Sequence, residues 1–186
     1  MAGSQRGGGA GGSAILVCAP EDRQPTCPAV GIADEVEALN VLCVSIDGDP
    51  ESRLEAIREW GVTLERTGVV SVGADEAVPP DPDRTYSTDI IEDVDQLSAL
   101  GTNVRDTLNE WAEGDVPTVL CFDSVTSLLQ RADMDLTFEF LLVLTESIRG
   151  SGAISHFHYD PATQHGADRR TLEHVFDHVV EAGGSE

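Results

Sequence analysis

The sequence predicts an α/β fold in which helices flank a single, mostly parallel β-sheet. Short runs of Val, Ile and Leu recur along the chain, and segments with apolar residues at helical spacing lie between them. Each run is continuously apolar, which is typical of strands that are buried on both faces of a parallel sheet. Because strands and helices alternate over 186 residues, we expect one three-layer domain with one core.

The first part of the chain is expected to hold three strands and two helices. Thr26 is a favoured N-cap residue and Pro28 is favoured in a first turn, so the first helix is predicted to begin there. The second helix, residues 50–60, is predicted to end at Gly61. Apolar residues of the first helix recur at helical spacing, at Val30, Ala33, Val36 and Leu39. The strands are predicted at residues 14–20, 40–46 and 68–73.

The second part of the chain is predicted to begin with a long Pro- and Asp-rich loop, residues 74–92. The helix at residues 134–149 is apolar on more than one face, so it is either covered on two sides or contacts a partner. Further helices are predicted at residues 93–112 and 168–177. The remaining strands are predicted at residues 117–122, 153–159 and 178–181.

The domain is predicted to span residues 13–182, between a flexible Gly-rich tail at 1–12 and a short tail at 183–186. The first twelve residues do not resemble a signal peptide, and no apolar run approaches the ~18 residues of a membrane span. We therefore expect a cytoplasmic protein. Cys18, Cys43 and Cys121 lie in apolar runs and are expected to be free, packing as small hydrophobic residues.

The chain is strongly acidic, with 34 Asp and Glu against 11 basic residues and a net charge of −23. Every basic residue is Arg, and Lys is absent. Such a surface repels nucleic acid and anionic membranes, so neither is expected as a partner. An acidic surface without Lys resembles the proteins of extreme halophiles. We therefore expect a halophilic protein that loosens at low salt, where charge repulsion is unscreened.

Residues 119–129 are similar to the strand–Asp–Ser–aliphatic–Thr signature of the KaiC-like branch of the RecA superfamily. Residues 138–145 and 171–177 extend the resemblance, and residues 45–50 resemble the family's segment after the second strand. The chain is also similar to an uncharacterised haloarchaeal family of KaiC-like proteins without a P-loop. The resemblance covers about residues 14–182. It implies a RecA-like domain and assembly as a homo-oligomer or with another KaiC-like protein.

The phosphate-binding loop of this superfamily is degenerate in the matching frame, residues 19–26. A P-loop needs two Gly residues, whose backbone N–H groups surround the phosphates, and a Lys that neutralises them. Ala19 and Gln24 replace the glycines, and Pro25 replaces the Lys and offers no N–H. Only Thr26, at the Mg²⁺-side hydroxyl position, remains. We therefore predict that ATP binding and hydrolysis are lost, with no catalytic residue and no cofactor.

The resemblance also implies that two carboxylates at the carboxyl ends of the strands, here called the rim, are remnants of a nucleotide site. Asp123, with Ser124 after it, occupies the place of the Asp that holds Mg²⁺ in P-loop enzymes. Without a P-loop we favour a structural role, in which Asp123 caps the following turn by accepting from N–H groups near Ser124 to Thr126. Asp47 and Gly48 stand where the KaiC-like branch has paired catalytic Glu residues, and Gly48 cannot act as a base.

The histidines cluster near the C-terminus and offer an alternative, a metal or small-ligand site. His156, His158 and Asp160 alternate along a predicted strand, and His174 and His178 have the i, i+4 spacing of helical zinc ligands. The opposing interpretation is that the first two are buried polar residues and the last two are solvated. A residual ligand site at the carboxyl ends of the strands would be lined by Thr26, Asp47, Asp123, Ser124, His158 and Asp160.

Two functions therefore remain open on the sequence. The first is a non-catalytic regulatory or interaction protein on a RecA-like scaffold, supported by the degenerate P-loop and the widely apolar helix 134–149. The second is an enzyme or sensor that uses the rim His and Asp residues, with a metal or a small ligand.

Overall fold

The computed structural model describes residues 11–20, 36–48, 50–59, 61–73, 86–91, 96–163 and 166–182. Seven strands form one all-parallel sheet in the order β4-β3-β2-β5-β6-β1-β7. The strands are β1 (Ser13–Cys18), β2 (Ala38–Ile46), β3 (Thr63–Val72), β4 (Tyr86–Ile91), β5 (Thr118–Asp123), β6 (Ile154–Tyr159) and β7 (His178–Glu181). The helices are α1 (Pro50–Arg58), α2 (Leu97–Trp111), α3 (Val125–Arg131), α4 (Met134–Ser151) and α5 (Gly166–Glu173).

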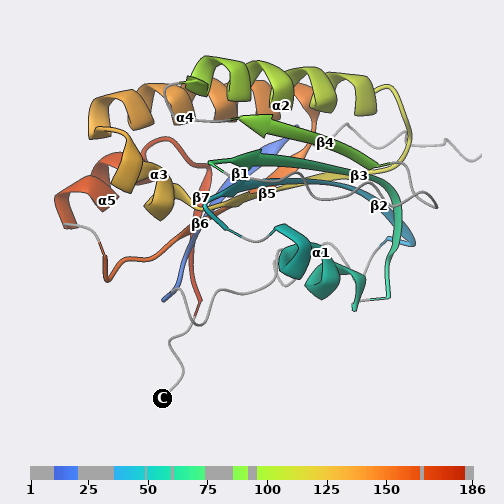
Figure 1. Cartoon of the computed structure of the whole chain (residues 1–186), viewed down its shortest axis with the longest axis horizontal. Helices are drawn as coiled ribbons and strands as arrows, with labels where there is room; N and C mark the ends of the chain where they lie inside the picture. The colour runs from blue at the N-terminus through green and yellow to red at the C-terminus, as the bar shows by residue number, and fades with distance from the viewer. Residues whose placement is uncertain are drawn as a thin grey trace, which may run out of the picture.

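Helices cover both sides of this sheet, which confirms the predicted three-layer α/β class. Helices α2 and α4 lie side by side over one face, and α1 lies on the opposite side (Figure 1). The central strands are buried along most of their length on both faces, as their continuously apolar sequences predict. None of the described helices is long and apolar enough to cross a membrane.

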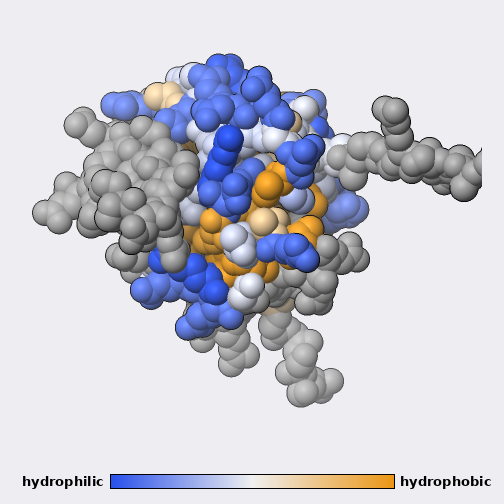
Figure 2. Space-filling model, turned by 90° about the vertical axis from the view of Figure 1, so that its right-hand side faces the viewer, coloured by the Kyte–Doolittle hydropathy of each residue, from blue (hydrophilic) through white to orange (hydrophobic). Residues whose placement is uncertain are grey.

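The two faces of the sheet carry separate apolar clusters. Under α2 and α4, Phe122 stacks on Phe157 with ring centroids 5.1 Å apart, and Phe157 contacts Phe176 at 5.0 Å. Under α1, Leu54 and Ile57 belong to a smaller cluster with residues of β2, β3 and β5. Its partly buried members Val36, Val62 and Leu64 lie where β2 and β3 begin. Figure 2 shows this end of the molecule, with an apolar area framed by hydrophilic residues.

The structure corrects several predicted elements. Strand β4 lies in the predicted 74–92 loop, where only its last two residues are apolar; it is an edge strand that pairs with β3 alone. Strand β3 begins at Thr63, before the predicted start at residue 68. Its first four residues are partly or fully exposed, so they do not form the apolar run from which a strand was predicted. Leu39 belongs to β2, not to a helix. The rest of the predicted first helix, up to residue 35, lies outside the described residues.

The last two helical corrections concern α3 and α5. Helix α3 occupies what was predicted as a Ser/Thr-rich turn, because Ser124 is its N-cap and accepts a hydrogen bond from the Ser127 N–H at 3.0 Å. Helix α5 ends at Glu173, four residues earlier than predicted. Helix α4 has the expected start, where Asp133 accepts from the Leu136 N–H at 2.8 Å. It continues to Ser151, two residues beyond the predicted end, and Gly152, whose φ is +76°, is its C-cap.

Two of the three cysteines that were predicted to be free and buried are so. Cys18 and Cys43 carry no disulfide, and burial raises the pKa of Cys18 to about 11 and that of Cys43 to about 12. Cys121 is disulfide-bonded, so its prediction as a free thiol was wrong. Spacing along the chain did not reveal this, since disulfide partners meet through the fold rather than through the sequence.

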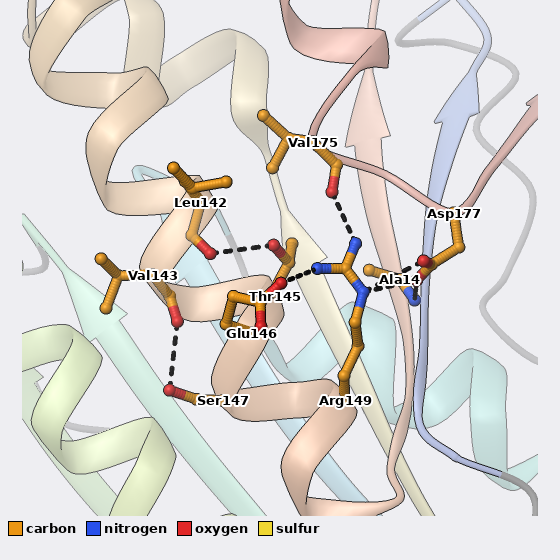
Figure 3. A network of polar contacts seen from close by, with 9 residues as sticks. All are labelled: Ala14, Leu142, Val143, Thr145, Glu146, Ser147, Arg149, Val175 and Asp177. Atoms are coloured by element: carbon orange, nitrogen blue, oxygen red, sulfur yellow. Dashed lines mark hydrogen bonds and ion pairs between the residues drawn. The ribbon is translucent and has the colours of Figure 1, made fainter.

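One arginine joins α4 to the last part of the sheet (Figure 3). The Arg149 Nε–H donates to both carboxylate oxygens of Asp177 at 3.0 and 3.1 Å, and Nη2 donates to the Val175 carbonyl at 2.8 Å. Asp177 also accepts from the Ala14 N–H at 2.8 Å. Burial alone would raise the pKa of Asp177, but the hydrogen bonds from Ala14 and Arg149 outweigh it and hold the pKa below its ordinary value. The carboxylate therefore connects α4, the α5–β7 turn and β1.

We predict that Asp177→Asn lowers the free energy of unfolding at pH 7 by about 1–2 kcal/mol. The substitution removes the charged group that accepts hydrogen bonds from Arg149 of α4 and Ala14 of β1. Since the folded-state pKa of Asp177 is depressed, this contribution is present above its unfolded value and is lost as the pH falls through the folded value. Chemical denaturation of both proteins in buffered KCl at pH 7 and at pH 3 measures the difference.

The matched control is Glu146→Gln, because Glu146 also bonds Arg149 but its side chain is 70% exposed. This control should cost less than about 1 kcal/mol, as exposed ion pairs do. An Asp177→Asn variant as stable as the control would contradict the prediction.

Candidate functional site

The candidate site is a small polar pocket at the carboxyl ends of β2, β5 and β6. This edge is where open α/β sheets place their ligands. The pocket holds about 130 Å³. Its lining residues come from the turn after β2, the β5–α3 junction, the first turns of α3 and the end of β6: Ile46, Asp47, Gly48, Asp123, Ser124, Thr126, Ser127, Gln130 and Asp160.

Hydrogen bonds within the pocket wall fix the ends of β5 and β6. The buried Thr126 hydroxyl, in the first turn of α3, accepts from the Asp160 N–H at 2.8 Å. The Asp160 carboxylate in turn accepts from the Ala162 N–H at 2.8 Å, which closes a turn directly after β6. Ser124 Oγ lies 3.0 Å from Ser127 Oγ. Most of the polar groups in the wall are therefore already engaged with other parts of the chain.

Asp123 forms an ion pair with an arginine of α1, the helix on the side of the sheet opposite α2 and α4 (Figure 1). Arg53, on α1, donates from Nη2 to Oδ2 of Asp123, and their side chains are only 16% and 28% exposed. The capping role predicted for Asp123 belongs instead to Ser124, whose hydroxyl accepts from the Ser127 N–H. Asp123 therefore contacts a guanidinium on α1, and its predicted contact with the N–H groups of α3 is wrong.

Asp47 is held in the same way by Arg131, the last residue of α3. Nε and Nη2 of Arg131 donate to the two carboxylate oxygens of Asp47, a bidentate geometry that Lys cannot provide. Asp47 has a φ of +57°, in the left-handed region, and its N–H donates to the Val72 carbonyl at 3.1 Å. A Cβ on Gly73 would lie 2.8 Å from Asp47 Oδ1 and 3.0 Å from Arg131 Nη2, so a side chain at position 73 would collide with the pair.

His156 and His158 are buried on the sheet face opposite Phe157 and Tyr159, as their alternation along β6 predicts. Burial lowers the pKa of His156 to about 4. Burial, with smaller contributions from Arg53 and His156, lowers the pKa of His158 to about 3. Both rings are therefore neutral at pH 7. His158 Nε2 lies 3.4 Å from the Cys121 sulfur, whereas neither ring nitrogen of His156 has a hydrogen-bond partner among the described residues.

The predicted helical pair His174 and His178 is wrong. Helix α5 ends at Glu173, so His174 lies in the following turn and His178 is the first residue of β7; both are exposed. Within the described part of the chain, no three His, Cys, Asp or Glu residues are placed to hold a metal ion. The five residues named for a metal or ligand site therefore do not meet at one point.

Four of the residues predicted at the rim do come together. Asp47, Asp123, Ser124 and Asp160 all line the pocket. Ala19 is buried beyond the end of β1, where its N–H donates to the Tyr159 carbonyl at 3.0 Å. His158 is fully buried and is not among the residues that line the pocket. Gln24, Pro25 and Thr26 lie outside the described residues.

The sequence reasoning missed the two arginines that neutralise the rim. No local pattern singles out Arg53 or Arg131, because each meets its carboxylate through the fold, across 70 and 84 residues of chain. The only available signal was general: with 11 cations against 34 acids, any partly buried Arg is expected to be paired.

We predict that Arg53→Gln destabilises the protein by about 1–3 kcal/mol, because it leaves Asp123 without its cation in a site that is largely shielded from water. The control is Arg66→Gln. Arg66 meets Glu110 at 3.7 Å, and the two side chains are 39% and 74% exposed, so its loss should cost less than about 1 kcal/mol. Urea denaturation of the three proteins in molar KCl is the measurement. Equal costs for the two variants would argue against a structural role for the Arg53–Asp123 pair.

The histidine burial predicts how stability depends on pH. The folded-state pKa of His156 is lowered, so protons bind the unfolded chain first and stability falls as the pH drops from about 6.5 towards 4. For His156 the full loss is on the order of 3 kcal/mol. His156→Leu should reduce this loss relative to the natural protein, and His174→Gln, at an exposed position, should not. Denaturation series from pH 4.5 to 7.5 compare the slopes, and a slope unchanged in His156→Leu would refute the assignment.

Comparison with known proteins supports the fold and places the chain in a family. No curated protein matches its sequence. A solved structure from a structural study of Pyrococcus horikoshii OT3 is similar, with a TM-score of 0.58 at 12% sequence identity, covering 92% of this chain and 82% of that chain. At this identity the likeness concerns the fold alone. The model of the family of unknown function DUF7504 matches residues 11–182, and the chain belongs to this family.

Proposed function

We propose that this protein is a non-catalytic member of the RecA/KaiC-like group that has lost ATP binding and hydrolysis and acts by interaction or regulation. The observation that carries the proposal is that two carboxylates of the rim form ion pairs within the chain. Asp123 and Asp47 are paired with Arg53 and Arg131 from the same chain. In an active P-loop site, a carboxylate such as Asp123 would hold the Mg²⁺ of the nucleotide.

The charge of the rim supports the loss of triphosphate binding. A triphosphate needs cations and backbone N–H groups directed at its oxygens. Among the residues that the structure describes, the lining of the 130 Å³ pocket contains three carboxylates and no Arg, and the chain contains no Lys. Arg53 and Arg131 are engaged with Asp123 and Asp47, so releasing either for a phosphate would leave a carboxylate unpaired beside a triphosphate.

The volume of the pocket points the same way. A pocket of about 130 Å³ is well below the ~300–1,000 Å³ that small-molecule and cofactor sites usually occupy. The alternative of a metal- or ligand-dependent enzyme or sensor has no comparable support among the described residues, because His156 and His158 are buried away from the pocket and no metal-binding group of three residues is present there. We therefore retain the interaction role.

Helix α4 supports that role. It buries Phe140, Leu141, Leu144 and Ile148 against the sheet, yet it also exposes Leu136, Leu142 and Val143 by 42%, 43% and 68%. Exposed apolar residues gathered on one element are a usual mark of a contact surface. Of the two kinds of partner that the resemblance implies, we propose another KaiC-like protein rather than a second copy, in a cytoplasm whose high salt suits the net charge of −23.

We predict that ATP with Mg²⁺ does not raise the melting temperature in molar KCl, because the two arginines that the structure describes at the rim are already paired with Asp123 and Asp47. The measurement is a thermal-shift titration of untagged protein from micromolar to millimolar ATP, with EDTA in place of Mg²⁺ as a parallel series. Binding to the folded state alone would raise stability as the ligand concentration passes Kd. A saturable, Mg²⁺-dependent shift at micromolar ATP would overturn the proposed function.

A further inference from the structure

A second and larger hollow lies on the outer side of the helical layer, away from the rim. Helices α2 and α4 run side by side there (Figure 1), and the groove between them holds about 410 Å³. Leu97, Phe140 and Leu144 form its buried floor. Leu136 and Val143 stand on its α4 side at 42% and 68% exposure.

The exposed apolar residues of the groove are spaced for contact with a helix. Leu136 and Val143 are seven residues apart, which places them two turns apart on one side of α4. From Leu136 to Ser147, the α4 wall extends about 17 Å, or three helical turns. Gly101 keeps the α2 wall low over Phe140, since even a Cβ there would already contact the Phe140 ring at 3.6 Å. The groove therefore fits one short helix laid along α2 and α4.

The charges around the groove select the chemistry of that helix. Arg105, which lines the groove, is bound by Asp106 at 3.0 and 3.1 Å, and Arg149 is bound by Asp177 and Glu146. Asp135 and Glu139 have no ion pair with any other residue that the structure describes. The two helices together carry a net negative charge, with Asp106, Glu110, Asp135, Glu139 and Glu146 against Arg105 and Arg149.

A second copy of this chain is the poorer occupant on these grounds. Two grooves brought face to face would place the same unpaired carboxylates against each other, and like charges at an interface cost affinity. A helix with one apolar face and Arg or Lys on both flanks meets the apolar floor, Glu139 in the wall and the net negative charge of the two helices. Such a helix-in-groove contact is a common mode of peptide recognition.

We propose that the α2–α4 groove binds a basic amphipathic helix of a partner protein. This inference rests on the proposed interaction function and supplies the surface and the chemistry of the partner. Val143 is the central apolar contact, because it is the most exposed of the large apolar residues that the structure describes. Glu139, one turn before it, meets a cation on the flank of the bound helix.

The test uses a fluorescent 16-residue probe peptide with Leu at i, i+3, i+4 and i+7 and Arg on both flanks, titrated with the protein in 0.5 M KCl. A second peptide carries Glu in place of each Arg. The variants are Val143→Asp and Leu142→Asp. These substitutions introduce the same charge at adjacent exposed positions of α4, but only Val143 lines the groove. Melting temperatures of both variants verify that the fold is kept.

We expect saturable binding of the Arg peptide, weakened about tenfold or more by Val143→Asp, which corresponds to ~1.4 kcal/mol, and changed less than about threefold by Leu142→Asp. The Glu peptide should bind at least tenfold more weakly than the Arg peptide. Absence of binding, or equal binding to both variants, would overturn the proposal. So would self-association of the natural protein in light scattering that Val143→Asp abolishes, because the occupant would then be a second copy.

Failure of this test is distinct from failure of the proposed function. If the Arg peptide does not bind and ATP causes no thermal shift, the loss of the nucleotide site stands and only the groove assignment falls. If ATP binds, the proposed function falls whatever the peptide does.

Discussion

The arginine–aspartate pair is the interaction on which the arrangement of this fold most depends. Arg53 ties α1 to the end of β5, Arg131 ties the end of α3 to the turn after β2, and Arg149 ties α4 to the start of β7. Each pair joins a helix to a strand end or turn that is distant in sequence. With only 11 cations in a chain of net charge −23, the placement of these few decides which carboxylates lie together without repulsion.

Apolar patterning predicted the parts of the fold that depend on burial. Six of the seven described strands were predicted from short apolar runs, and helices α1, α2 and α4 from apolar residues at helical spacing. The missed parts are β4, whose sequence is largely polar, and α3, whose seven residues are too few to show a clear apolar period. At the site, the rim position of Asp47, Asp123, Ser124 and Asp160 followed from strand ends. Arg53 and Arg131 did not, since their contacts arise only in the folded chain.

The rim and the groove divide the molecule into two surfaces with different chemistry. At the rim, polar side chains are directed at one another, and little hydrogen-bonding capacity is left for a ligand. On the outer helical layer, apolar side chains on α4 are left in contact with water although the same helix supplies much of the core. Polar groups of the rim are thus satisfied within the chain, whereas apolar groups of α4 are left in contact with water.

Gly73 shows how closely the rim is built around its ion pair. The space that a side chain would need is filled by the carboxylate of Asp47 and the guanidinium of Arg131, and the backbone at position 73 has a φ of +74°. We therefore expect positions 47, 73 and 131 to vary together among family members. A family member that loses the arginine gains room for a larger residue at position 73, and one that keeps the arginine retains glycine there. Covariation among positions 47, 73 and 131 would show that the ion pair and the glycine are kept together.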